Sequence, residues 1–236
     1  MTAASVLQMT GVRKNYSALR PLRIKSLAIA PAERVAIIGF DAAGAELIVN
    51  LVTGASLPDE GLVRVFGRGT AEISDGEQWL ASLDQFGIVT DRAVLLEGAT
   101  LAQNLTLPFT LEIDPIAPEM RARVAQLAEE CDIAAAWMEQ QAGALPPGIK
   151  ARAHLARAIA LEPALLLMEH PTAALPEADR EAFGAVVARV CGARGLPTLM
   201  VTADPRFASA AAQRTLTLDP ATGALTSPKT GRWFGR

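Results

Sequence analysis

The segment Gly39-Phe-Asp-Ala-Ala-Gly44-Ala45-Glu46 has the arrangement of a loop that binds phosphate. A β-branched apolar run precedes it and apolar residues at helical spacing follow it, which predicts a strand, a short loop and a helix. Backbone N–H groups of such a loop and the positive end of the helix converge on an anion. The full motif also carries a lysine and a hydroxyl residue, where this chain has Ala45 and Glu46. Two glycines five residues apart are by themselves a weak signal.

Ordered motifs in the second half of the chain strengthen this interpretation. They comprise Leu145-Pro-Pro-Gly-Ile-Lys-Ala-Arg-Ala-His-Leu-Ala-Arg-Ala158, then Glu162-Pro163, then Leu165-Leu-Leu-Met-Glu169-His170-Pro171-Thr-Ala-Ala-Leu175-Pro176. In this order the segments resemble the ATP-binding subunit of ABC transporters. The opening Gly11-Val-Arg-Lys-Asn-Tyr16 and the stretch from Val89 to Pro108 fit the same family at the expected spacing.

The resemblance covers about residues 5–220 and implies the fold. We expect an α/β protein with a P-loop NTPase-like ABC ATPase fold. Its largely parallel sheet would be accompanied by an antiparallel β subdomain and an inserted helical subdomain.

The resemblance also assigns positions to a nucleotide site. The nucleotide-binding positions are Tyr16, which would stack on adenine, and Gly39, Asp41, Ala42, Gly44, Ala45 and Glu46. The signature positions are Leu145, Pro146, Pro147, Gly148 and Ile149. The positions that match the family's catalytic residues are Asp91, Glu169, His170 and Ala203.

Most of these positions depart from the family's pattern. Ala45 and Glu46 replace the Walker A lysine and hydroxyl, and Ala42 replaces its middle glycine. The remaining replacements are Asp91 for the Q-loop glutamine, Glu169 for the Walker B aspartate, His170 for the catalytic glutamate, Pro146 and Pro147 within the Leu-Ser-Gly-Gly-Gln signature, Pro176 for the D-loop aspartate and Ala203 for the H-loop histidine. Only Tyr16, Gly39, Gly44 and Gly148 remain of the set that contacts nucleotide.

These replacements predict weak or vestigial binding of ATP and Mg²⁺. Loss of the lysine removes a charged contact of about 1.5–3 kcal/mol. The carboxylate of Glu46 would repel phosphate by about 4 kcal/mol at ~4 Å and an effective dielectric constant near 20. Phosphoryl transfer depends on positive charge and a held metal. We therefore expect no catalytic residue and no hydrolysis of ATP.

By the same resemblance, the acidic side chains would converge at this site. They are Asp41, Glu46, Asp91 and Glu169. One interpretation is a divalent cation site completed by His170. The other is that Glu46 or Glu169 pairs with His170 or a nearby arginine, which neutralises the vacated pocket. No ligand spacing is diagnostic, and we expect no metal.

The resemblance thus favours a catalytically inactive structural or regulatory subunit of a membrane transport complex. The expected partners are a membrane permease subunit and a second ATP-binding subunit, and any homodimer or heterodimer would form without nucleotide. The permease would dock on the helical subdomain, at Leu107 to Pro118. Two alternatives are a soluble ABC-fold interaction protein without a transport role and a functional transport ATPase with weak ATP binding. The transported substrate and the direction of transport stay open.

Alternating strand and helix patterns supply the elements that must position these residues. Strands are predicted at Val6–Val12, Leu22–Ala30, Arg34–Gly39, Leu62–Phe66, Phe86–Thr90, Ala164–Glu169 and Pro197–Thr202, and near Leu216 and Leu225. Helices are predicted at Gly44–Val52, Pro118–Cys131, Ile133–Gln141, Gly148–Leu161 and Glu177–Cys191. We expect one domain, 1–236, with a core at 1–97 and 142–228, a helical subdomain at 98–141 and a basic tail at 229–236.

Composition limits the remaining possibilities. Half of the residues are hydrophobic, which excludes a disordered chain, and a net charge of −3 argues against nucleic acid as a partner. No apolar stretch approaches the ~18 residues of a membrane span, and the first residues do not resemble a signal peptide. Cys131 and Cys191 form no metal-ligand spacing and are expected to be reduced thiols. We expect a cytoplasmic protein, peripheral on the cytoplasmic face of the inner (plasma) membrane.

Overall fold

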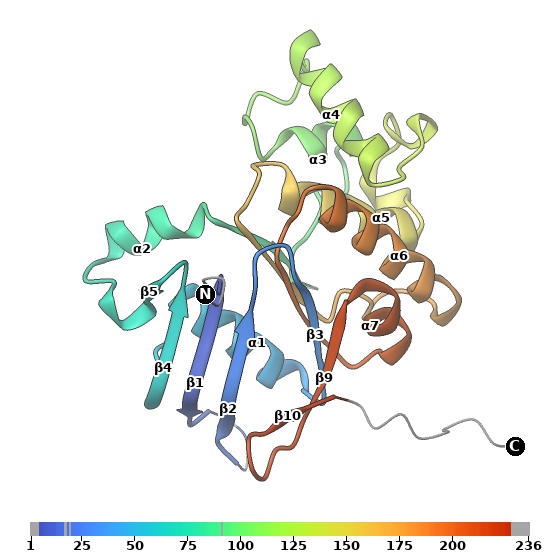
Figure 1. Ribbon diagram of the computed structural model, residues 1–236. Coiled ribbons are helices and arrows are strands. Elements are labelled where there is room, and N and C mark those ends of the chain that lie inside the picture. Colours follow the sequence, from blue (N-terminus) through green and yellow to red (C-terminus); the bar gives the residue numbers. More distant parts are fainter. Residues whose placement is uncertain (1–4, 17, 19, 91, 228–236) are drawn as a thin grey trace, which may run out of the picture.

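The computed structural model describes residues 5–16, 18, 20–90 and 92–227. Their strands form two sheets (Figure 1). The smaller sheet is antiparallel and has the order β2 (Leu22–Ile29), β1 (Leu7–Lys14), β4 (Glu60–Val65), β5 (Arg68–Gly69). The larger sheet has the order β10 (Leu225–Thr226), β9 (Arg214–Leu218), β3 (Arg34–Ile38), β8 (Thr198–Thr202), β7 (Leu165–Glu169), β6 (Phe86–Val89). Its strands from β9 to β6 are parallel, and β10 pairs antiparallel with β9.

Seven α-helices accompany the two sheets in the described part of the chain. They are α1 (Ala42–Thr53), α2 (Gly76–Leu83), α3 (Leu101–Thr106), α4 (Pro118–Glu130), α5 (Pro147–Ile159), α6 (Glu177–Ala193) and α7 (Pro205–Ala211). Short 3-10 turns occupy Thr70–Glu72, Ala135–Trp137 and Ala142–Ala144. In Figure 1, α1 lies beside the antiparallel sheet, whereas α3 and α4 form a separate group above α5 and α6.

Two hydrophobic cores lie on opposite faces of the parallel sheet because successive strand residues point to opposite sides. In β3, Val35 and Ile37 pack with α1 and the antiparallel sheet, and Ala36 packs with the core of α3 to α7. In β7, Leu167 packs with α1 and the antiparallel sheet, and Met168 packs with the core of α3 to α7. Burial on both faces explains why these strands read as continuous apolar runs in the sequence.

The expected α/β architecture is confirmed, and most elements lie within two residues of their predicted bounds. The elements β5, α2, α3 and α7 are additional to those predicted. Each of the three additional helices is preceded by a residue whose side chain accepts a hydrogen bond from the first turn. These residues are Asp75 before α2, Thr100 before α3 and Asp204 before α7. These caps are the sequence signal that could have located them.

The predicted helix at Ile133–Gln141 is wrong. Only the 3-10 turn Ala135–Trp137 forms there. The backbone of this segment bonds instead to the start of α3, since Leu101 N–H donates to the carbonyl of Gln140 and Ala102 N–H donates to that of Met138. These tertiary hydrogen bonds replace the internal bonds that a helix would need.

Both cysteines lie in the core between α4, α6 and their neighbours. Cys131 and Cys191 are buried free thiols. Burial raises the pKa of Cys131 to about 12 and also raises the pKa of Cys191. Both are therefore protonated near neutral pH and poorly reactive.

Two sequence predictions concern residues that the structure does not describe. The basic tail at 229–236 and Asp91 lie outside the described residues. Among the described residues, no helix combines the length and the apolar character that crossing a bilayer requires.

Candidate functional site

The loop between β3 and α1 binds one of its own carboxylates. Asp41 precedes the first residue of α1, and its Oδ1 accepts a hydrogen bond of 2.8 Å from the backbone N–H of Gly44. A helix N-terminus attracts an anion through its unpaired N–H groups and its dipole. In this chain, Asp41 supplies that anion.

Two aromatic side chains lie beside the same loop. A Cβ built on Gly44 would lie 2.9 Å from Phe40 Cδ1 and 3.0 Å from Asp41 Oδ1, so a larger residue would force these side chains to shift, and the Tyr16 hydroxyl would lie 3.5 Å from it. Phe40 is buried, and Tyr16 packs against the same core. Burial and, to a lesser extent, the carboxylate of Asp41 raise the pKa of Tyr16. Tyr16 therefore lies over the loop itself.

Ala45 and Glu46 are adjacent near the start of α1, but one side chain is buried and the other is exposed. Ala45 is completely buried in the core beneath the loop. The side chain of Glu46 is 47% exposed, and its Oε1 lies 2.6 Å from Nη1 of Arg92.

Arg92 joins two elements that are distant in sequence. Its Nη2 donates to Glu169 Oε2 at 2.8 Å, while Nη1 contacts Glu46. The Glu169 side chain, at the end of β7, is only 4% exposed, and that of Arg92 is 48% exposed. A guanidinium fork matches two carboxylate partners well. The guanidinium thus lies between the start of α1 and the end of β7.

This geometry decides between the two interpretations of the acidic residues. Glu46 and Glu169 do converge, and the cation between them is a nearby arginine, as the second interpretation stated. Asp41 is engaged at the cap of α1 instead. Within the described part of the chain, no group of three or more His, Cys, Asp or Glu side chains is arranged to hold a metal ion.

His170 follows β7 in a strained conformation. Its φ is +40°, a region that favours glycine, and its N–H donates to the carbonyl of Val201. Its Nε2 atom is buried and has no hydrogen-bond partner. A buried polar atom without a partner costs about 1–3 kcal/mol.

The predicted signature positions form the start of α5. Leu145 is buried, Pro146 is the N-cap, and Pro147 is the first helical residue. No side chain caps this end. Proline has no N–H, so neither proline can donate a hydrogen bond to a ligand here. Gly148 and Ile149 continue the helix.

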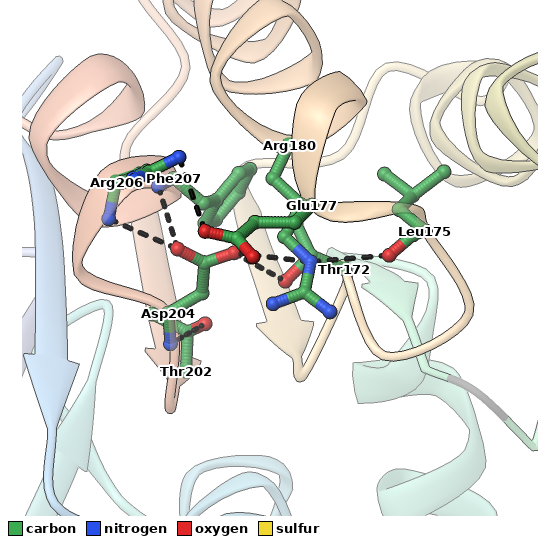
Figure 2. Close-up of polar contacts among 8 residues, drawn as sticks. All are labelled: Thr172, Leu175, Glu177, Arg180, Thr202, Asp204, Arg206 and Phe207. Carbon is green, nitrogen blue, oxygen red and sulfur yellow. Dashed lines mark hydrogen bonds and ion pairs between the residues drawn. The ribbon is translucent and has the colours of Figure 1, made fainter.

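Ala203 has no polar side chain, and its neighbour Asp204 organises the surrounding loops (Figure 2). Asp204 Oδ1 accepts from the N–H groups of Arg206 and Phe207, which caps α7. Its Oδ2 accepts from the Thr172 hydroxyl at 3.3 Å and lies 3.5 Å from Nε of Arg180. The segment after β7, α6 and α7 are thereby tied together.

Comparison with known proteins identifies the family. The profile described as ABC transporter matches residues 22–173. The chain belongs to the ABC transporter family.

Curated relatives are similar over most of this ABC-family chain. It is 30% identical over 221 residues to the methionine import ATP-binding protein MetN of Brucella abortus (strain 2308), which covers 92% of this chain and 58% of the relative. It is 30% identical over 209 residues to the Fe(3+) ions import ATP-binding protein FbpC 2 of Rhodococcus jostii (strain RHA1), which covers 88% of this chain and 58% of the relative. The chain therefore spans a little over half the length of these relatives.

Solved structures confirm the expected ABC ATPase fold. One is a dimeric ATP-binding cassette in a post-hydrolysis state bound to ADP and Pi, with a TM-score of 0.74 and 22% identity; the match covers 94% of this chain and 98% of that one. Another is cbiO1 from Clostridium perfringens, with a TM-score of 0.76 and 18% identity, covering 94% of this chain and 87% of that one.

Sequence reasoning missed two residues of this ABC-family site, Arg92 and Phe40. Arg92 is 46 positions from Glu46 and 77 from Glu169, and no local spacing connects them. Phe40 was visible as the one bulky residue in a loop of small ones. That break in the pattern was the available signal.

Proposed function

We propose that this chain is a non-hydrolysing structural or regulatory ATP-binding-cassette subunit of a membrane transport complex. The observation that carries the proposal is the position of Arg92 between Glu46 and Glu169. The replacements in Walker A and Walker B then neutralise one another, because Arg92 pairs with Glu46 and Glu169 where a phosphate-binding loop would hold a nucleotide and its metal ion.

Both charges of a bound Mg-nucleotide have an internal counterpart. The carboxylate of Asp41 takes the anion position at the start of α1. The guanidinium of Arg92 takes the position of a cation between the start of α1 and the end of β7. Phe40 and Tyr16 lie against Gly44 of the loop. The residues present therefore do not fit ATP with Mg²⁺.

Displacement of Arg92 by a metal would be costly. Removing one partner of a buried ion pair destabilises a protein by about 3–5 kcal/mol, and we discount this to about 2–3 kcal/mol because Arg92 is half-exposed. That free energy corresponds to a loss of about 30- to 150-fold in affinity. The exposed carboxylate of Glu46 would add repulsion to any phosphate brought to the loop.

We propose that association is also independent of nucleotide. Pro146 and Pro147 have no N–H of their own with which to hold a nucleotide of a second subunit. The relatives named above are described as import ATP-binding proteins. By analogy, the proposed partners are a membrane permease and a second ATP-binding subunit, at the cytoplasmic face of the membrane.

The proposed permease contact lies on the helical subdomain, 98–141. Leu111 is 86% exposed, as a docking residue would be. Phe109 packs against the core and under the Arg123 guanidinium, 3.9 Å from the ring centroid, so its replacement would also perturb folding. Leu111→Glu is therefore the cleaner variant, with Leu57→Glu as its exposed, apolar control on another face.

Calorimetry with ATP, with and without Mg²⁺, tests the nucleotide part of the proposal. We expect no binding tighter than millimolar and no release of phosphate above background. Arg92→Met removes the cation between Glu46 and Glu169, and Arg189→Met is its matched control. Both arginine side chains are 48% exposed, and both pair with a carboxylate. Low-micromolar ATP affinity in the unmodified chain, or turnover near ~1 s⁻¹, would overturn the proposal.

Affinity purification from the native host tests the transport part. We expect a membrane permease and a second ATP-binding subunit to copurify, with recovery unchanged by Mg-ATP and reduced by Leu111→Glu alone. Recovery of this chain without any membrane protein would contradict the transport role. Conversion of monomer to dimer by ATP would contradict nucleotide-independent assembly.

A further inference from the structure

A cavity of about 320 Å³ lies beside the start of α5, distinct from the loop after β3. It is bounded by the end of β6, by the first turns of α5 and by the segment after β7. The chain has only two histidines, His154 and His170, and both line this cavity.

Among the described residues that line the cavity, the ionisable side chains are one lysine and two histidines, all of them bases. Lys150 lines it, and its Nζ donates to the Gly143 carbonyl at 3.1 Å, which leaves two further donors on the ammonium. Pro147, the first residue of α5, also lines it, and no side chain caps this helix. The positive end of a 13-residue helix therefore borders the cavity.

No carboxylate balances these groups among the described residues that line the cavity. Glu169, the neighbour of His170 in sequence, is held by Arg92. An anion entering the cavity would thus meet a lysine, a helix N-terminus and two imidazoles.

The histidines give the cavity an unused hydrogen-bonding group. The His170 ring lines the cavity, and its buried Nε2 atom has no partner, so a small shift of the ring would let this atom bond to a ligand. The rest of the wall is mostly apolar, including Val89, Ala151 and Leu175. Pockets for small molecules typically combine such an apolar wall with a few polar groups.

We propose that this cavity is a binding site for a small organic carboxylate with an apolar body, whose charge lies toward Lys150 and the start of α5 while its body lies against the apolar wall. The proposal does not depend on the absence of ATP hydrolysis, because the cavity does not include the loop after β3.

Nuclear magnetic resonance of the imidazole rings provides a direct test, since both histidines of the chain report on one cavity. The protein, free of any histidine tag, is titrated with benzoate as the organic carboxylate, with benzamide as its neutral isostere and with inorganic phosphate as a bare anion. His154→Gln and His170→Asn assign the two signals. We expect saturable shifts of both rings with benzoate, at least about fivefold weaker binding of benzamide, and weak binding of phosphate.

A pair of lysine variants decides whether the charge acts as proposed. Lys150→Met should weaken benzoate binding by about fivefold, whereas Lys25→Met, an exposed lysine on the antiparallel sheet, should leave it unchanged. Circular dichroism confirms that each variant folds. Absence of saturable shifts, equal binding of benzoate and benzamide, or equal effects of the two lysine variants would each overturn the proposal.

Discussion

The starts of α1 and α5 are opposite solutions to the same electrostatic problem. Each is a helix N-terminus with unpaired N–H groups, and each lies where the family resemblance implies nucleotide contacts. At α1, Asp41 caps the helix and Arg92 neutralises the neighbouring carboxylates. At α5, no side chain caps the helix, and a cavity lined by Lys150 and two histidines remains beside it.

The difference shows that two replaced motifs need not have the same consequence. Replacements at α1 come with partners from elsewhere in the chain, so the charges of that region are paired internally. Replacements at α5 remove donors and add nothing in their place, so that region stays open. Variants of the first region should therefore cost stability, and variants of the second should change stability little or increase it.

Loss of the guanidinium should produce the largest effect. Arg92→Met removes the cation between Glu46 and Glu169 and should lower the free energy of unfolding by about 2–3 kcal/mol. For a chain of this size, Tm should fall by about 5–10 °C in thermal unfolding. Adding Glu169→Gln should recover much of the loss, because the buried charge is then removed as well. Equal stability of Arg92→Met and the unmodified chain would show that the bridge does not close the α1 region.

Restoring a lysine to the α1 region should be the next largest effect. Ala45 is completely buried, and Ala45→Lys must either bury an ammonium or displace the core side chains around it. We expect a loss of about 2 kcal/mol, by overpacking, and no gain in ATP affinity. The control is Ala43→Lys, at an exposed position in the same turn, which should be nearly neutral. Micromolar ATP binding by Ala45→Lys would show that the loop is not closed by its own side chains.

At the open region, relief of backbone strain should stabilise the protein. His170 has φ of +40°, so His170→Gly should be more stable than His170→Ala by about 1 kcal/mol, or about 2–4 °C in Tm. The alanine variant is the matched control, since it removes the imidazole but retains the Cβ. Identical Tm values for the two variants would mean that the segment after β7 relaxes freely.

The smallest effect should be a change in pH dependence. Burial, and secondarily the charge of Arg157, lowers the pKa of His154 below the ordinary histidine value of 6.5. A base with a lowered pKa in the folded state binds its proton more readily when unfolded, so its contribution to stability is present above pH 6.5 and is lost as the pH falls. His154→Gln should therefore lose less stability than the unmodified chain between pH 7.5 and 5.5, as measured by Tm at each pH. A larger loss in the variant would contradict the neutral state of this side chain.

The sequence alone predicted the alternation of strands and helices, because periods of apolar residues report burial locally. The resemblance carried by Gly39, Gly44 and the segment from Leu145 to Pro176 then indicated the family, and both predictions are confirmed. The failure at Ile133–Gln141 has a tertiary cause, since the backbone there bonds to residues at the start of α3.

The sequence also determined which charges this protein carries at its site, because Ala45, Glu46 and Glu169 are fixed by their positions in the motifs. Only the tertiary structure decided how those charges are satisfied. Arg92 reaches Glu46 and Glu169 because β6, β7 and α1 meet at one end of the parallel sheet, and both histidines share a cavity because α5 crosses beside the end of β7. Such contacts depend on strand order, which brings together residues 46 to 77 positions apart and leaves no periodic trace in the chain.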